Sequence, residues 1–164
     1  MKYENFNDVE VLKIAVNMEE EGLAFYSSLA KSVNDAKVKE IFSKLANEEK
    51  DHLDNFKKVY NEITASRASA QGSEDYTVDE YLRHLVETGV FTQKGEVKRL
   101  TAEIKTDIDA LRIGIQAEKD AILFYSEAAK NTKNKEGQKA FGFLASEEKK
   151  HLKLLADLLR VLKE

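Results

Sequence analysis

The sequence of 164 residues contains no cysteine, no proline and no tryptophan, and it has only seven glycines. Without cysteine, the chain can form no disulfide, no thiolate zinc site and no Cys-ligated iron–sulfur cluster. Any redox chemistry would therefore depend on oxygen and nitrogen ligands. Without proline, nothing in the sequence interrupts the hydrogen-bond ladder of a helix, and long stretches rich in Ala, Leu, Lys and Glu favour helices. These absences predict an all-α protein.

Long hydrophobic runs and clusters of basic residues are also absent. No segment approaches the roughly 18 uninterrupted apolar residues of a membrane span, and the N-terminal MKYENFNDVEVL lacks the apolar run of a signal peptide. We therefore expect a cytoplasmic protein without a membrane partner. The net charge is −4 and lysines are interleaved with acids, so we expect no nucleic-acid partner. With 42% hydrophobic residues, residues 1–164 are predicted to form a single domain.

The sequence contains an internal repeat. One shift of 99 residues, the separation of Glu19 and Glu118, aligns two pairs of segments without a gap. The aligned segments are EEEGLAFY (19–26) with EKDAILFY (118–125), and LANEEKDHL (45–53) with LASEEKKHL (144–152). Each half, about residues 7–64 and about 104–163, is therefore predicted to be two helices joined by a short turn.

Each predicted helix has an apolar stripe that acids or histidines interrupt. Apolar residues recur every three or four positions, which places them on one face of a helix. Six ionisable residues occupy positions in these stripes: Glu19, Glu49, His52, Glu118, Glu148 and His151. We expect them to meet midway along a four-helix bundle. Five other acids fall outside the stripes and are interpreted as surface charge: Glu20, Glu21, Glu48, Asp120 and Glu147. For Glu48 and Glu147 the alternative is that they support the inward residues from outside.

A crossover of about residues 65–103 separates the two helix pairs. It begins with turn-forming residues and continues with a predicted short helix, for which Thr77 and Glu80 match a capping box and Gly89 is the expected stop. A connection of this length can return the chain along the bundle. We therefore predict one long crossover, which leaves the second and third long helices parallel.

The six inward residues predict a two-metal site. Burying four carboxylates without compensation would cost many kcal/mol or force some of them to remain protonated. Two divalent ions supply four positive charges, which would balance the four carboxylates while both histidines stay neutral. One E-x-x-H segment in a Glu-rich helix is weak support for a metal site. Two such segments in register, each with a glutamate on a neighbouring helix, are strong support.

The E-x6-Y and E-x-x-H segments in each half resemble the rubrerythrin and bacterioferritin branch of the ferritin-like superfamily. The resemblance covers most of the chain and implies a ferritin-like four-helix bundle that binds two Fe ions, with Mn or Zn as alternatives. It implies that Glu49 and Glu148 bridge the metals, that Glu19 and His52 complete one shell, and that Glu118 and His151 complete the other.

The sequence departs from both branches in ways that affect function. Rubrerythrins carry a further glutamate one turn after the ligand on the third helix, where this chain has Ala121, and Gly22 is at the equivalent place in the first half. The chain also lacks a cysteine-containing rubredoxin module, so a separate, rubredoxin-like electron donor is expected. Bacterioferritins place a haem-ligating Met where this chain has Lys50 and Asp51. No haem is therefore expected. A storage cage is not expected either, because the sequence ends within the fourth helix.

The resemblance implies a non-haem di-iron oxidoreductase that reduces hydrogen peroxide with electrons from an external donor protein. Dioxygen is the other candidate oxidant, and a homodimer is expected for a bundle of this family. Two alternatives stay open: a ferroxidase that binds or stores iron, and a structural bundle that acts as an interaction module. Tyr26 and Tyr125 are candidates to hydrogen-bond a ligand carboxylate or to quench an oxidising equivalent, and the alternative is that both are ordinary core tyrosines.

Overall fold

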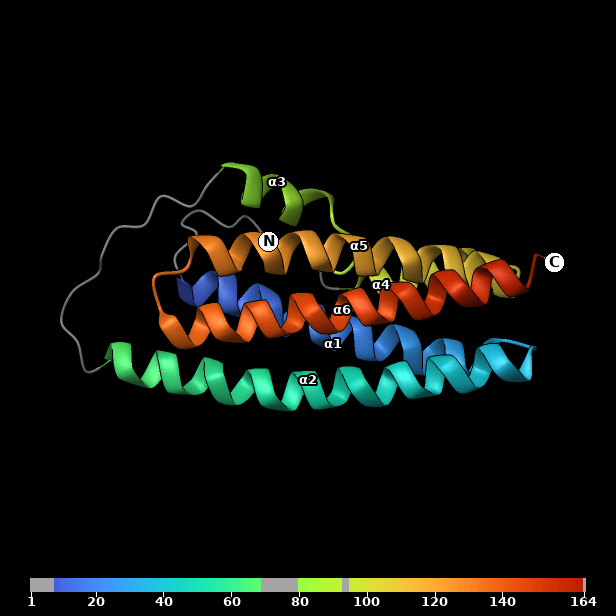
Figure 1. Ribbon diagram of the computed structural model, residues 1–164, viewed down its shortest axis with the longest axis horizontal. Helices are drawn as coiled ribbons and strands as arrows, with labels where there is room; N and C mark the ends of the chain where they lie inside the picture. Colours follow the sequence, from blue (N-terminus) through green and yellow to red (C-terminus); the bar gives the residue numbers. More distant parts are fainter. Residues whose placement is uncertain (1–7, 69–79, 93–94, 164) are drawn as a thin grey trace.

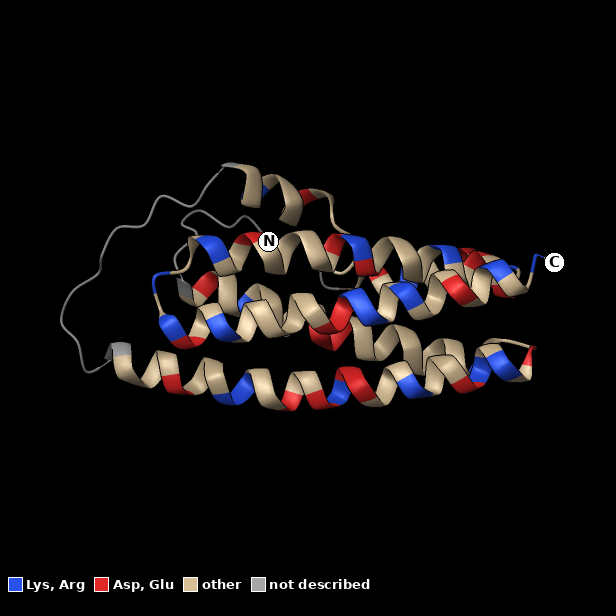
Figure 2. Cartoon of the chain, viewed as in Figure 1, with Lys and Arg blue, Asp and Glu red and all other residues tan. Residues whose placement is uncertain are grey.

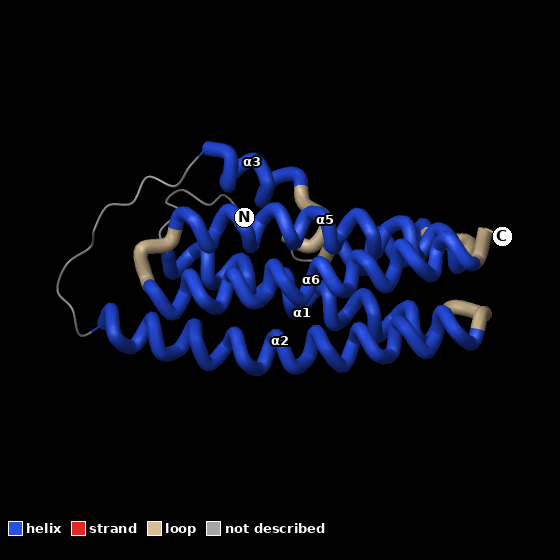
Figure 3. The backbone as a smooth tube through the Cα atoms, in the orientation of Figure 1, coloured by secondary structure: helices blue, strands red, loops and turns tan. Residues whose placement is uncertain are grey.

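The computed structural model describes residues 8–68, 80–92 and 95–163. Within these ranges the chain forms six helices and no strand (Figures 1 and 3). The helices are α1 (Asp8–Ser32), α2 (Ala36–Ala68), α3 (Glu80–Thr88), α4 (Glu96–Glu103), α5 (Asp107–Asn131) and α6 (Lys135–Val161). Four of them, α1, α2, α5 and α6, form a long bundle. The predicted all-α bundle of two helix pairs is confirmed.

The two pairs follow the predicted topology. Helix α1 packs extensively against α2, and α5 packs in the same way against α6. Figure 1 shows that α2 ends at one end of the bundle and α5 begins at the other, so these two helices run parallel. The long crossover therefore returns the chain along the bundle, as predicted. None of the described helices has the length and apolar character that a membrane-spanning segment needs.

Equivalent residues of the repeat form the tight turns within the two pairs. The carboxylate of Asp35 accepts hydrogen bonds from the backbone N–H groups of Lys37 (2.8 Å) and Val38 (3.0 Å) at the start of α2. Asn134, which occupies the same place in the second half, caps α6 by accepting from the Gly137 N–H at 2.9 Å. Both caps satisfy backbone donors that the first turn of a helix leaves unpaired.

The core repeats in the same way. The ring of Tyr26 stacks on Phe42 with centroids 5.8 Å apart, and the equivalent pair Tyr125 and Phe141 stacks at 6.3 Å. All four rings are fully buried, and each contributes about 1.5–3 kcal/mol through the apolar area removed from water. Lys, Arg, Asp and Glu recur along all four bundle helices (Figure 2), while the buried residues are mainly apolar. The apolar stripes thus point inward as the periodicity predicts.

The crossover contains two short helices instead of the single one predicted. Helix α3 ends immediately before Gly89, as expected, whereas Thr77 of the predicted capping box lies outside the described residues. The backbone of Gly89 is not left-handed; glycine is needed because a Cβ would lie 2.8 Å from Thr92 Cγ2 and 2.9 Å from the Leu85 carbonyl. Helix α4, which the sequence analysis missed, follows Gly95, whose φ of 92° is in the left-handed region.

Two acids that were interpreted as surface charge hold this crossover in place. Glu21 on α1 accepts hydrogen bonds from the backbone N–H groups of Gly95 (3.0 Å) and Val97 (3.3 Å), at the start of α4. Asp120 on α5 accepts from the Val90 N–H at 3.0 Å, just after α3. Glu21 and Asp120 are equivalent positions of the repeat. Each half of the bundle therefore anchors one part of the crossover, and the interpretation of both acids as surface charge was wrong.

Candidate metal centre

The six inward acids and histidines come together in the middle of the bundle. Helices α1 and α5 each supply one glutamate, Glu19 and Glu118, and α2 and α6 each supply a Glu and a His three residues apart. A spacing of three residues places both side chains on the same face of a helix. All six residues are buried, with exposed fractions of 2–6%. The structure therefore brings together the six residues that the sequence predicts to share one site.

The two glutamates on α2 and α6 lie between the two histidines. Glu49 presents Oε2 to His52 Nδ1 at 3.9 Å and Oε1 to His151 Nδ1 at 3.3 Å. Glu148 presents Oε1 to His52 Nδ1 at 3.7 Å and Oε2 to His151 Nδ1 at 2.8 Å. Each carboxylate thus offers one oxygen to each side of the centre. The imidazole rings stack with centroids 5.4 Å apart.

The single glutamates on α1 and α5 each face one histidine. Glu19 Oε2 lies 3.6 Å from His52 Nδ1, and Glu118 Oε1 lies 3.7 Å from His151 Nδ1. Their positions are fixed by tyrosines from the opposite half of the bundle. Tyr125 on α5 donates a hydrogen bond to Glu19 Oε1, and Tyr26 on α1 donates to Glu118 Oε1. Both tyrosines are therefore core residues that also orient a carboxylate of the centre.

Several buried polar atoms of the centre form no hydrogen bond with the described part of the chain. They are Glu19 Oε2, His52 Nδ1, Glu148 Oε2 and His151 Nδ1. Unpaired buried polar atoms are rare because each costs about 1–3 kcal/mol. Three of these residues, together with Glu49, form a cluster: one ligand atom each from Glu49, His52, Glu148 and His151 lies within 4.8 Å of the other three. Imidazole nitrogens and carboxylate oxygens in this arrangement fit a metal site.

Two carboxyl groups of the centre have a raised pKa. Burial raises the pKa of Glu19 to about 8, and the charge of Glu49 adds to this effect. Burial also raises the pKa of Glu148, together with the charges of Glu49 and Glu118. Burial acts in the same direction on Glu49, but the neighbouring imidazoles of His151 and His52 outweigh it and lower its pKa to about 2. Glu49 is therefore the carboxylate that stays ionised most readily.

Neighbouring carboxylates raise the pKa of both histidines. Burial would lower the pKa of His52, but the neighbouring carboxylates of Glu19 and Glu49 outweigh burial and raise it to about 9. The pKa of His151 is raised against the effect of burial by Glu118, Glu148 and Glu49. Protons on the histidines and carboxyl groups thus balance the buried negative charge. A metal ion has to displace these protons, because its ligands bind in their deprotonated forms.

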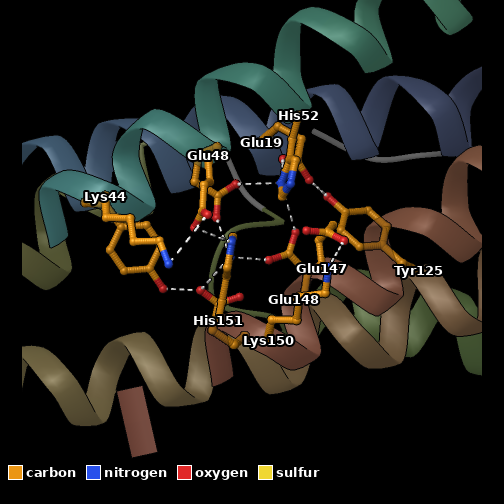
Figure 4. A network of polar contacts seen from close by, with 12 residues as sticks. Glu19, Lys44, Glu48, His52, Tyr125, Glu147, Glu148, Lys150 and His151 are labelled. Atoms are coloured by element: carbon orange, nitrogen blue, oxygen red, sulfur yellow. Dashed lines mark hydrogen bonds and ion pairs between the residues drawn. The ribbon is translucent and has the colours of Figure 1, made fainter. Parts of the chain in front are cut away.

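The surroundings of the two histidines differ, although the inner residues match. Glu48, which is 40% exposed, places Oε2 3.4 Å from His151 Nε2 (Figure 4). Its repeat equivalent, Glu147, forms an ion pair with Lys150 instead. Contact with the inward residues was the alternative to surface charge for both acids. The segments EEKDH and EEKKH differ where the second has Lys150, the partner of Glu147, and the first has Asp51. The structure assigns a contact with the centre to Glu48.

Comparisons with known proteins agree with this architecture. A hypothetical protein from Pyrococcus furiosus has a TM-score of 0.68 and 26% identity, over 98% of this chain and 93% of that chain. A proposed ferritin-like diiron-carboxylate protein from Thermotoga maritima has a TM-score of 0.67 and 25% identity, over 97% of this chain and 98% of that chain. No curated protein matches the sequence significantly.

The sequence also matches the family model described as Rubrerythrin over residues 10–159. This match includes all six inward acids and histidines and both tyrosines that orient them. It extends from the first turn of α1 to the last turn of α6. The chain belongs to the rubrerythrin family.

Proposed function

We propose that the chain binds two iron ions and uses them to reduce hydrogen peroxide with electrons from a separate donor protein. The bound pair would supply two electrons, one from each ion, which is the number that peroxide needs to become water. The chain contains no cysteine, so it carries no rubredoxin module to supply those electrons. A rubredoxin-like donor protein would therefore complete the cycle.

The observation that carries the proposal is the sharing of two carboxylates between the histidines. Glu49 and Glu148 each direct one oxygen toward His52 and the other toward His151. This arrangement supports a bridging role for both residues. The single glutamates face one histidine each, which supports Glu19 with His52 on one metal and Glu118 with His151 on the other.

The remaining inner residues hold these groups in place and keep water out. Tyr26 and Tyr125 occupy one oxygen of each single glutamate, which leaves the other oxygen of Glu19 unpaired and directed at the centre. Both tyrosines are almost fully buried, and burial together with the neighbouring carboxylates raises the pKa of each phenol. The tyrosines therefore remain protonated donors. A preorganised site of this kind requires little rearrangement during the reaction.

The first experiment is stopped-flow oxidation of the full chain loaded anaerobically with two Fe(II) per chain. Equal concentrations of hydrogen peroxide and dioxygen should be compared under the same conditions. We expect oxidation to be much faster with peroxide. Equal or faster oxidation with dioxygen would contradict peroxide reduction and favour a ferroxidase, for which size-exclusion chromatography should also reveal a large assembly that holds many irons per chain.

A further inference from the structure

A pocket of about 270 Å³ lies between α2 and α6, beside the metal centre. Its walls are mainly apolar, formed by Phe56, Val59, Ala140, Phe143 and Leu144, and His52 also lines it. Small-molecule sites in proteins are typically mostly apolar pockets with a few polar groups that fix orientation. The pocket has this character.

The imidazole of His52 lies between the pocket and the centre. Its Nδ1 is fully buried and faces Glu19, Glu49 and Glu148 at 3.6–3.9 Å. Its Nε2 forms no hydrogen bond or ion pair with the described residues, although His52 as a whole is only 6% exposed. When Nδ1 ligates a metal, Nε2 carries the hydrogen and is a donor. The polar group of the pocket is therefore a free N–H next to the metal centre.

The chemistry of the rim indicates an uncharged ligand. Glu136 and Lys139, which also line the pocket, pair with each other at 2.9 Å, so they add no net charge. Phe143 is 54% exposed and meets the His52 ring edge-on with centroids 6.1 Å apart. An exposed aromatic ring at the mouth of an apolar pocket offers a contact surface for an apolar group.

The hollow beside the other histidine differs in chemistry. Its volume is similar, about 260 Å³, but it is lined largely by charged residues, including Glu48, Lys150 and Asp157. In that hollow, Nε2 of His151 is already close to Glu48, at 3.4 Å. An apolar molecule with a hydrogen-bond acceptor would therefore choose the His52 side.

The geometry points to an organic hydroperoxide as the substrate of this side, with its apolar group in the pocket and its peroxide oxygens accepting a hydrogen bond from His52 Nε2. Hydrogen peroxide has two heavy atoms and would leave most of the volume unfilled, since a water molecule takes about 30 Å³ of liquid. Reduction of R–O–O–H takes two electrons and two protons, breaks the O–O bond and gives an alcohol, R–O–H, and water. This inference rests on the proposed function, in which the metal pair supplies the electrons and the donor protein replaces them.

The first test measures binding without any reaction. We would titrate the full chain with cumyl alcohol, the product of cumene hydroperoxide reduction, and follow the ring signals of Phe143 by NMR. Ala140→Leu fills the pocket and Phe143→Ala removes its outer wall, so each should weaken binding at least about tenfold. Gly142→Ala is the matched control on α6, because a Cβ there meets no atom within 4 Å. Absence of binding, or equal binding in the wild type and both pocket variants, would overturn the proposal.

The second test measures substrate choice. Single-turnover oxidation of the iron-loaded chain should be recorded with cumene hydroperoxide and with hydrogen peroxide. The ratio of the two rate constants should fall at least about tenfold in Ala140→Leu, because the larger peroxide loses its place in the pocket. An unchanged ratio would contradict the inference. If neither peroxide oxidises the protein while cumyl alcohol still binds, the proposed function fails but the pocket as a binding site stands.

Discussion

The two sides of the metal centre have the same inner residues and different outer ones. On both sides a glutamate, a histidine and a tyrosine come from equivalent positions of the repeat. Beyond them, His151 Nε2 lies 3.4 Å from Glu48, whereas His52 Nε2 has no such partner in the described chain and lines an apolar pocket. The duplicated sequence therefore preserves the ligands while the surroundings of the ligands diverge.

If two metals bind as proposed, this difference would make their positions chemically unequal. A carboxylate that accepts a hydrogen bond from the outer nitrogen of a ligating histidine fixes its tautomer and makes it a stronger donor. Glu48 Oε2, 3.4 Å from His151 Nε2, is the carboxylate placed for this role on the His151 side. We therefore expect the metal beside His151 to be held more tightly and the metal beside His52 to be more accessible. The predictions below test first what the two sides share and then what separates them.

Replacing a shared glutamate should have the largest effect. Glu49→Ala or Glu148→Ala removes an oxygen from both sides at once, so each variant should lose both iron ions. By contrast, Glu19→Ala and Glu118→Ala each remove a group from one side and should retain about one iron per chain. The number of irons per chain, measured after anaerobic loading and desalting, distinguishes the two groups of variants. Two irons per chain in both Glu49→Ala and Glu148→Ala would disprove the assignment of the site.

The pH dependence of metal binding should be the next largest effect. Protons on Glu19, His52, Glu148 and His151 must leave when two metals bind, so binding at pH 7 should release about four protons. Affinity should therefore rise with pH, and the slope should fall as the pH passes through the pKa values of Glu19, about 8, and His52, about 9. Calorimetry with Mn(II) in buffers of different ionisation enthalpy measures proton release. Release that does not vary between pH 6.5 and 9 would contradict the titration of the His52 side.

The sequence was sufficient to predict this inner layer. Each inward acid or histidine interrupts an apolar stripe. Because amphipathic helices pack with their apolar stripes facing one another, these residues must lie in the interior of the bundle. The outer residues were predicted only in part: contact with the centre was an alternative for both Glu48 and Glu147, although Lys150, the partner of Glu147, has Asp51 as its equivalent beside Glu48. Which of them reaches a histidine depends on how α2 and α6 approach each other. Helix α4 was missed for a related reason: the first N–H groups of this short helix are bound by Glu21, which is 75 positions before the helix begins at Glu96.

Removal of Glu48 should separate the two sides. Glu48→Gln weakens the partner of His151 Nε2, and loss of such a partner typically lowers metal affinity about 10- to 100-fold. The effect should be confined to one of the two metals. Glu147→Gln is the matched control, since Glu147 pairs with Lys150 and should change either affinity less than about threefold. Competition titration with a chromophoric chelator gives both constants, and equal losses in the two variants would refute the asymmetry.

The two tyrosine variants should lose similar amounts of stability, because Tyr26 and Tyr125 occupy equivalent positions on the two sides of the centre. Tyr26→Phe and Tyr125→Phe each remove a hydrogen bond to a buried carboxylate, at a cost of about 1–3 kcal/mol in the free energy of unfolding. Because both tyrosines are almost fully buried, the two losses should agree within about 0.5 kcal/mol. Urea unfolding of the metal-loaded variants measures them. A large difference between the variants would show that the asymmetry extends inward to the ligands.

The acids that hold the crossover should have the smallest effect, and it should leave the metal centre unchanged. Glu21→Ala removes the acceptor of two backbone N–H groups at α4, and Asp120→Ala removes the acceptor of one after α3, so we expect losses of about 1 and about 0.5 kcal/mol. The loss of about 1 kcal/mol corresponds to a decrease in Tm of roughly 2–4 °C, and the smaller loss corresponds to a smaller decrease. Glu20→Ala is the control, because Glu20 forms an exposed ion pair with Lys57 that contributes little. Metal content should equal that of the wild type in all three variants, since none of these acids faces a histidine of the centre. A loss of metal in Glu21→Ala or Asp120→Ala would show that the crossover supports the centre as well as the fold.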